Sequence, residues 1–198
     1  MAAPIPGTVP RVFVARGLNE FISELKAMPA EIERAEQAAI NGMLTKVRTE
    51  IVNTIHADTG LKKKIARQRL IPRRARPSDL HGFLTATPGP NLLLNYDVKK
   101  TKISPTRVAV EANVFIGGRR KTGRTTFINP KYDAGKAYRR PIDKSTGKPK
   151  GKRKVLAKGP SMAFYMYQIV TPKYENQKLS EFNDLFAKKL DGIIKRRK

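Results

Sequence analysis

The sequence predicts an α+β protein with N-terminal amphipathic helices, a small antiparallel β-sheet carrying a long basic loop, and a C-terminal helix. Three observations predict this order: helical spacing of apolar residues up to residue 58, an alternation of period two from residue 92, and helical spacing again from residue 176. We expect an N-terminal arm at 1–16, a single α+β domain at 17–170 and the C-terminal helix at 171–198. Within the domain, helices occupy 17–76 and the strand-rich basic part occupies 80–170.

The N-terminal part begins with a Pro/Gly-rich stretch at residues 1–10, which predicts an extended arm. A short amphipathic helix follows from Leu18. Pro29 then opens a longer helix, because proline is tolerated in the first turn. The apolar stripe of this helix consists of Ile40, Met43 or Leu44, Val47, Ile51 and Ile55, and Asp58-Thr59-Gly60 ends it.

A strongly basic stretch, TGLKKKIARQRLIPRRAR, runs from Thr59 to Arg76 with eight Lys/Arg and no acidic residue. We expect a short helix whose first turn is capped by Thr59. Pro72 should stop that helix, because proline lacks a backbone N–H and clashes with the preceding turn. The stretch then forms a cationic hinge between the helices and the strands.

The strand-rich part shows alternation in Leu92–Val98 and again in Arg107–Val114. The short connection Lys99–Pro105 between them predicts an antiparallel hairpin. His81–Thr87 predicts a further strand. The apolar run Met162–Val170 has an ambiguous period that fits either a strand or a helix.

The C-terminal helix is predicted from Asn176 onward by apolar residues at helical spacing. Its stripe consists of Leu179, Phe182, Leu185, Phe186, Leu190, Ile193 and Ile194. The closing Lys/Arg residues lie at the negative end of the helix dipole, which favours cations.

The net charge of +25 is concentrated in the middle of the chain. Residues 1–58 carry −1, residues 59–174 carry +23 and residues 175–198 carry +3. Such an excess predicts an anionic partner, and nucleic acid and an acidic protein surface fit equally well. There is no cysteine, so disulfides and thiolate metal sites are excluded. No signal peptide or membrane span is recognisable, and we expect assembly in a cytoplasm without a membrane partner.

Catalytic motifs are weak. Gly118–Thr125 resembles a phosphate-binding loop with Arg124 in place of lysine, but strand-like residues and Pro130 follow where a helix is needed. A basic β-turn is the better interpretation. His56 and His81 lie in different elements without metal-ligand spacing. We therefore expect no catalytic residue, no metal, no cofactor and no enzymatic activity.

The residues expected to contact DNA or another anionic partner belong to the basic stretch and to the later Arg/Gly-rich segment. They are Lys62, Lys63, Lys64, Arg67, Arg73, Arg74, Arg119, Arg120, Lys121 and Arg124.

The order of motifs resembles the minor tail protein Z family of tailed bacteriophages. A long alanine-containing helix runs into TGLKKKIARQRLIPRRA, strands and the segment GGRRKTGRTTFI follow, and LAKGPSMA precedes the C-terminal helix. The resemblance covers roughly residues 35–166. Its most specific positions are Thr59, Gly60, Leu61, Ile65, Arg69, Leu70, Arg74 and Ala75, with Gly159, Pro160 and Ser161.

The resemblance implies a non-enzymatic virion protein of the tail or neck, needed for tail completion and for joining the tail to the head. Such proteins usually form rings of six. The implied partners are copies of the chain itself, the tail tube or terminator, the head–tail connector, and genomic DNA through phosphate contacts. The alternative left open by the residues is a sequence-independent nucleic-acid-binding protein, ribosomal-like or DNA-packaging.

Overall fold

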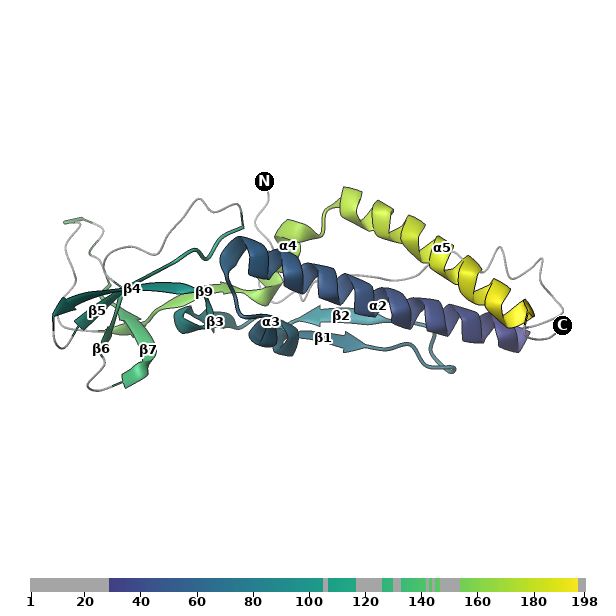
Figure 1. Cartoon of the computed structure of the whole chain (residues 1–198), viewed down its shortest axis with the longest axis horizontal. Coiled ribbons are helices and arrows are strands. Elements are labelled where there is room, and N and C mark those ends of the chain that lie inside the picture. The colour runs from purple at the N-terminus through teal and green to yellow at the C-terminus, as the bar shows by residue number, and fades with distance from the viewer. Residues whose placement is uncertain are drawn as a thin grey trace. The chain divides into compact units, whose positions relative to one another are not determined.

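The computed structural model describes residues 29–104, 107–116, 126–129, 133–141, 143, 145–146 and 154–195. The chain is α+β, as predicted, and it forms two compact units (Figure 1). The first unit contains Arg69–Thr87 together with the residues up to Ile51 and those from Met166 onward. The second unit contains Val52–Gln68 and Pro88–Tyr165. The predicted arm at 1–16 and the short helix from Leu18 lie outside the described residues.

Helix α2 spans Pro29–Thr59 and confirms the predicted long helix. Glu31 lies in its first turn, where a carboxylate interacts favourably with the helix dipole. Gly60 follows the last turn with a φ of 67°, a left-handed conformation that favours glycine. The N–H of Gly60 donates to the carbonyl of His56 at 2.8 Å, which satisfies one of the free carbonyls at the helix end.

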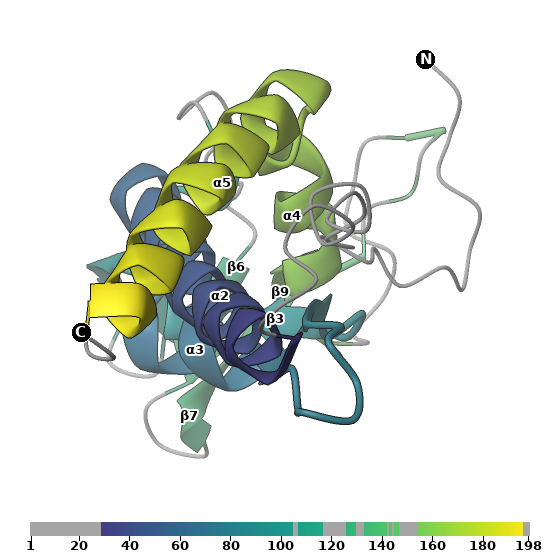
Figure 2. The ribbon, with the colours of Figure 1, turned by 90° about the vertical axis from the view of Figure 1, so that its right-hand side faces the viewer.

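Helix α5, Pro172–Lys195, packs antiparallel to α2 within the first unit (Figures 1 and 2). A Cβ on Gly42 of α2 would lie 3.2 Å from Leu185, whereas Lys46, one turn later, reaches back to Glu181. The predicted stripe is confirmed at Phe182 and Phe186, which are buried, but Leu179 is 44% exposed.

The N-terminal end of α5 lies four residues earlier than the apolar stripe suggested. Thr171 precedes the helix, and its Oγ1 accepts the N–H of Tyr174 at 3.3 Å. Pro172 occupies the first helical position, where its missing N–H removes no hydrogen bond. The capping pair Thr171-Pro172 therefore marks the start of the helix, ahead of its first apolar residue.

An ion-pair network with one buried member, Lys178, joins α2 to α5. The ammonium group of Lys178, whose residue is 3% exposed, lies 2.7 Å from Glu50 and 2.8 Å from Glu181. Glu181 also pairs with Lys46 at 2.7 Å, and the hydroxyl of Tyr174 donates to Glu50 at 3.2 Å. Hydrogen bonds from Lys178 and Lys46 lower the pKa of Glu181 to about 2. The buried ammonium of Lys178 is therefore neutralised by two carboxylates.

The first unit also contains a two-stranded sheet formed by β1, Leu70–Arg73, and β2, Phe83–Ala86. β2 confirms the strand predicted within 81–87. The loop between them is held against α2 by Asn41, whose side-chain oxygen accepts the N–H of Ala75 at 3.0 Å and whose amide donates to the Ala75 carbonyl at 3.2 Å.

Helix α3, Lys63–Arg69, is shorter than predicted, and both of its ends differ from the expectation. Thr59 does not cap it, because Thr59 is the last residue of α2, where its Oγ1 donates to the carbonyl of Ile55 at 2.6 Å and accepts the N–H of Leu61 at 3.3 Å, two residues before α3 begins. Pro72 does not end the helix either. It lies inside β1 opposite Leu84, because pairing with β2 has already drawn the backbone into a strand from Leu70 onward.

The second unit contains an antiparallel five-stranded sheet in the order β4-β5-β6-β7-β8. The strands are β4, Val98–Ser104; β5, Arg107–Ala112; β6, Thr126–Asn129; β7, Asp133–Arg139; and β8, Val155–Leu156.

The predicted hairpin exists, but its first strand was placed wrongly. β4 occupies the residues that were expected to form the connection, with Val98 opposite Ala112. Residues 90–95 instead form the short strand β3, Pro90–Leu92, and a 3₁₀ turn, η1, Leu93–Asn95. Leu93 is 1% exposed, so burial of this residue, rather than strand pairing, produces the apolar pattern.

The ambiguous apolar run forms a helix, α4, Met162–Ile169. Strand β9, Lys158–Ser161, precedes it and pairs antiparallel with β3. The hydroxyl of Ser161 accepts the N–H of Phe164 at 3.2 Å, so this serine caps the helix. Within the described ranges, no helix is long and apolar enough to cross a lipid bilayer.

The ion-pair network between α2 and α5 contributes to the free energy of unfolding in a pH-dependent way, and the variant Glu181→Gln tests this contribution. We expect the variant to be less stable than the natural chain by about 1–2 kcal/mol at pH 7. Because the folded pKa lies below the ordinary value of 4.5, this contribution is present above pH 4.5 and is lost as the pH falls toward 2. The difference between the two proteins should therefore shrink on acidification, as measured by urea unfolding at pH 7, 5 and 3.

The matched control is Asp184→Asn, at an exposed position of the same helix without an ion pair among the described residues. This control should change stability little at any of the three pH values. A difference for Glu181→Gln that stays constant from pH 7 to pH 3 would contradict the assignment.

Candidate functional site

The predicted contact residues divide into three groups. Lys62, Lys63, Lys64 and Arg67 belong to the second unit, and Arg73 and Arg74 to the first. The other four residues, Arg119, Arg120, Lys121 and Arg124, lie outside the described residues, as does the loop Gly118–Thr125. The single basic stretch read from the sequence is therefore split between the two units.

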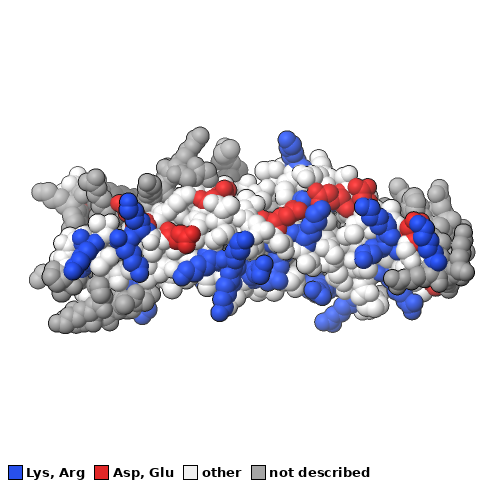
Figure 3. Space-filling model, in the orientation of Figure 1, with Lys and Arg blue, Asp and Glu red and all other residues white. Residues whose placement is uncertain are grey.

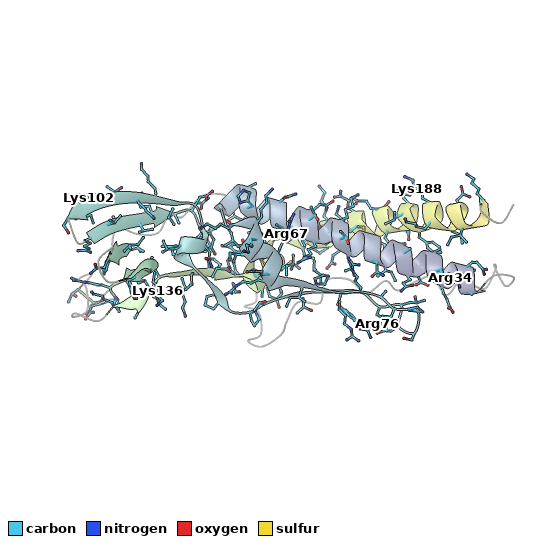
Figure 4. The ribbon with its side chains drawn as sticks, turned by 60° about the horizontal axis from the view of Figure 1, so that its bottom comes forward. Arg34, Arg67, Arg76, Lys102, Lys136 and Lys188 are labelled. Carbon is cyan, nitrogen blue, oxygen red and sulfur yellow. The ribbon has the colours of Figure 1, made fainter. Side chains whose placement is uncertain are left out.

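The lysines at the start of α3 are exposed and unneutralised. Lys62, Lys63 and Lys64 make no ion pair with any described residue, and Arg67 is exposed one turn further along the helix (Figure 4). The helix is anchored from beneath by Ala66, which is fully buried. Cations at a helix N-terminus are unfavourable because the dipole is positive there, and the first turn of α3 contains no acidic residue. These lysines thus contribute a cationic surface at some expense of helix stability.

The arginines at the end of β1 and in the loop that follows it are in a different environment. Arg73 lies 3.5 Å from Asp79 and stacks over the Phe83 ring at 5.8 Å, so its charge is partly neutralised within the unit. His81 lies 2.8 Å from the same carboxylate, and this hydrogen bond, aided by the charges of His81 and Arg73, lowers the pKa of Asp79. Arg74 and Arg76 are exposed, and Figure 4 shows Arg76 on the loop.

Strand β4 contributes basic residues that were not predicted as site residues. Lys99, Lys100 and Lys102 are exposed on this edge strand and pair with no carboxylate among the described residues. Lys102 lies toward the far end of the strand (Figure 4). The sequence signal was present, but these lysines were assigned to a connection. Lysine on an edge strand hinders pairing with foreign strands, and this structural role applies to all three positions.

The distribution of charge distinguishes the two units. Over the whole chain, the second unit contains 23 Lys/Arg and 5 Asp/Glu, a net charge of +18, whereas the remaining residues account for +7. Acidic side chains accompany the basic ones along α2 and α5 (Figure 3). The second unit is therefore the more strongly cationic part.

The first motif of the family resemblance forms a corner at the end of α2. Gly60 follows this helix, and a Cβ at this position would lie 2.9 Å from the Cβ of Asp97. The N–H of Asp97 donates to the Gly60 carbonyl at 2.9 Å, and the N–H of Lys62 donates to the Asn95 carbonyl at 2.9 Å. Leu61 is fully buried between these contacts. Gly60 and the buried Leu61 thus fit the chain against residues 95–97.

The second motif of the family resemblance, Gly159-Pro160-Ser161, packs on Tyr96, the residue before Asp97. A Cβ on Gly159 would lie 2.6 Å from the hydroxyl of Tyr96, so only glycine fits there without displacement. The carbonyl of Pro160 accepts a hydrogen bond from the Asn91 amide at 2.7 Å. The hydroxyl of Tyr96 lies 2.9 Å from that of Tyr165. The two motifs, distant in sequence, therefore meet the same short segment at Tyr96 and Asp97.

The histidines take local roles in the described structure. Nδ1 of His56 lies 3.0 Å from the Leu61 carbonyl at the end of α2, and His81 pairs with Asp79. The described part of the chain contains no group of three His, Cys, Asp or Glu side chains arranged to hold a metal ion.

Comparison with known proteins gives no relative: no protein-family model, no curated protein and no solved structure matches this chain. The assignment of function therefore depends on the residues and on the geometry described above.

The close approach of Gly159 to Tyr96 is tested by Gly159→Ala. The added methyl group must displace a fully packed tyrosine, and we expect a loss of about 1–3 kcal/mol in the free energy of unfolding. Gly192→Ala is the matched control, because a Cβ there meets nothing within 4 Å and the residue lies in helix α5. This control should raise stability by up to about 1 kcal/mol. Equal effects of the two substitutions in chemical denaturation would refute the packing argument.

The α3 lysines are tested by the triple substitution of Lys62, Lys63 and Lys64 with glutamine. Because these cations oppose the helix dipole, we expect the free energy of unfolding to stay constant or to rise by up to about 1 kcal/mol. Affinity for a DNA duplex should fall, and the slope of log K against log salt should decrease by up to about 2.7. A control triple with glutamine at Lys173, Lys188 and Lys189, all exposed on α5, removes the same charge. A substantial loss of stability in the α3 triple would instead indicate a structural role.

Proposed function

We propose that this chain is a non-enzymatic structural protein of a tailed-phage virion, acting in tail completion at the neck. In this role it forms a ring that joins the tail tube or terminator to the head connector around the DNA channel. Its partners are copies of itself, most simply in a ring of six, together with those tail and head proteins. It is assembled in the host cytoplasm and becomes part of the virion.

The observation that carries the proposal is the convergence of the two motifs on one segment. Gly60 approaches Asp97, and Gly159 approaches Tyr96, the preceding residue. Motifs that are about 100 positions apart in the sequence therefore contact one short segment, so both serve the same part of the fold. This agreement supports the resemblance to the minor tail protein Z family at the positions where the resemblance is most specific.

The charge distribution supports the DNA-channel part of the proposal. Lys62, Lys63, Lys64 and Lys99 are exposed without ion pairs to described residues, in the unit that carries +18. Self-repulsion of this size destabilises an isolated unit, and a polyanion in a channel relieves it. Acidic surfaces on neighbouring tail proteins would serve the same purpose.

The same cationic surface favours a second candidate function, sequence-independent nucleic-acid binding by a ribosomal-like or DNA-packaging protein. In that case the isolated monomer itself binds tightly, and binding weakens steeply with salt because phosphate contacts release counterions. Ring formation is not required.

The mass of the purified protein and its appearance in negative stain, at low and high salt and without nucleic acid, separate the two candidates. We expect closed rings that persist in high salt, either with the protein alone or after addition of tail components. A monomer that changes only on addition of DNA or RNA, and releases it in salt, would reject the neck assignment in favour of the binding protein.

A further inference from the structure

The register of the five-stranded sheet assigns each side chain to one of two faces. Residues directly opposite one another point to the same side of a sheet, and neighbours along a strand alternate. Val110 and Ile128 share one side, here called the Ile128 face, and Ala109 lies opposite Phe127 on the other side, here called the Phe127 face. The register extends the Phe127 face to Thr101, Tyr138 and Leu156.

The Ile128 face is the core side of the sheet. Its central side chains are 5% exposed or less: Val110, Ala112, Thr126, Ile128 and Ala137. The Phe127 face is more open at its centre, since Ala109, Glu111, Tyr138 and Leu156 are half-buried. On the edge strand β4 the residues of both faces are exposed, Lys99 and Thr101 on the Phe127 face and Lys100 and Lys102 on the other. An antiparallel sheet with one packed face and one solvated face is an ordinary arrangement. Among the described residues, the Phe127 face is therefore the less covered side of the sheet.

Two cations cover the aromatic ring at the centre of this open face. The guanidinium carbon of Arg107 lies 4.6 Å from the centroid of the Phe127 ring, and the ammonium of Lys154 lies 5.8 Å from it. The ring is only 4% exposed although it lies on the open side of the sheet. The Nε of Arg107 is buried and has no hydrogen-bond partner among the described residues, so ring contact holds this side chain in place of an ion pair.

The charges on the Phe127 face are mostly positive. Arg107, Lys154 and Lys99 make no ion pair with a described carboxylate. Glu111 lies opposite Lys99 and is a negative charge on the same face, but no ion pair joins the two. The two stacked cations are thus fixed in position, and no described carboxylate neutralises them. Negatively charged phosphate oxygens could pair with cations arranged in this way.

We propose that the Phe127 face binds the phosphate backbone of duplex DNA, with Arg107, Lys154 and Lys99 as contact residues. Five strands at about 4.8 Å spacing give a surface roughly 19 Å across, about half a helical turn of the duplex. Phe127 does not stack on bases, because the two cations cover it. The contact is therefore made to the backbone and is independent of sequence. The inference rests on the DNA-contacting part of the proposed function and does not depend on ring formation.

The sharpest test compares neighbouring lysines on opposite faces of the same strand. Lys99 lies on the Phe127 face opposite Glu111, and Lys100 lies on the other face opposite Val110; both are exposed and unpaired among the described residues. Binding of the full chain to a labelled 30-base-pair duplex is measured by fluorescence anisotropy between about 50 and 200 mM salt. We expect Lys99→Gln to lower the slope of log K against log salt by about 0.9, and Lys100→Gln to leave it unchanged.

Three further variants test the role of the stacked cations and the effect of the negative charge on the same face. The double variant Arg107→Gln with Lys154→Gln should weaken binding about tenfold to a hundredfold near 0.1 M salt. Arg107→Lys keeps the charge and should retain most of the affinity. Glu111→Gln should strengthen binding, because it removes a negative charge beside the phosphates. Circular dichroism of each variant shows whether the sheet is intact.

The outcomes separate the competing explanations. Equal losses for Lys99→Gln and Lys100→Gln would overturn the proposal, because they indicate a diffuse effect of net charge. Unlabelled polyglutamate that displaces the natural chain more readily than unlabelled duplex would also overturn it, by identifying an acidic protein as the occupant. Failure of the natural chain to bind the duplex rejects this inference alone, whereas failure to form rings rejects the neck assignment and leaves the DNA result standing.

Discussion

The second unit depends on the hydrogen bonds and close contacts around Tyr96. Its hydroxyl meets the hydroxyl of Tyr165, which in turn donates to the carbonyl of Val114 at 2.7 Å, just after β5. Burial and the bond to Tyr96 raise the pKa of Tyr165, so this hydroxyl remains a neutral donor. Because Gly159 lies against the same ring, helix α4, strand β9, the turn η1 and the end of β5 are fixed together at one point. The corner at Gly60 is attached through the adjacent Asp97.

The two units differ in how their basic side chains are accommodated. In the first unit, the ammonium of Lys178 is buried, and its desolvation is offset by Glu50 and Glu181. In the described part of the second unit, Lys62, Lys63 and Lys64 at the start of α3 and the lysines of β4 lie at exposed positions, and Arg107 lies over an aromatic ring. Charges that are paired internally stabilise a fold, whereas charges that are exposed and unpaired are available to a partner. This contrast points to the second unit as the part of the protein that contacts an anion.

Much of the fold follows from local patterns, and the errors have a common cause. The long helix from Pro29, the C-terminal helix and the hairpin were predictable because periodicity and capping act over a few residues. The placement of Leu93 and Pro72 was wrong because long-range contacts decided it: Leu93 is buried in a 3₁₀ turn, and Pro72 pairs across β1 and β2. The α3 lysines were identified from charge alone, but Arg107 was missed because its partner Phe127 lies on another strand.

The sequence by itself determined the class of the fold, the cationic character of its middle part and the positions of the two short motifs. These properties depend on composition and local spacing, which are fully present in the chain. Only the tertiary structure decided that both motifs meet at Tyr96 and Asp97, and that Arg107 and Lys154 converge on Phe127. Such contacts depend on strand register, and a shift of one residue moves every side chain of a strand to the opposite face. For this reason the charge could be predicted from the sequence, and the face that presents it could not.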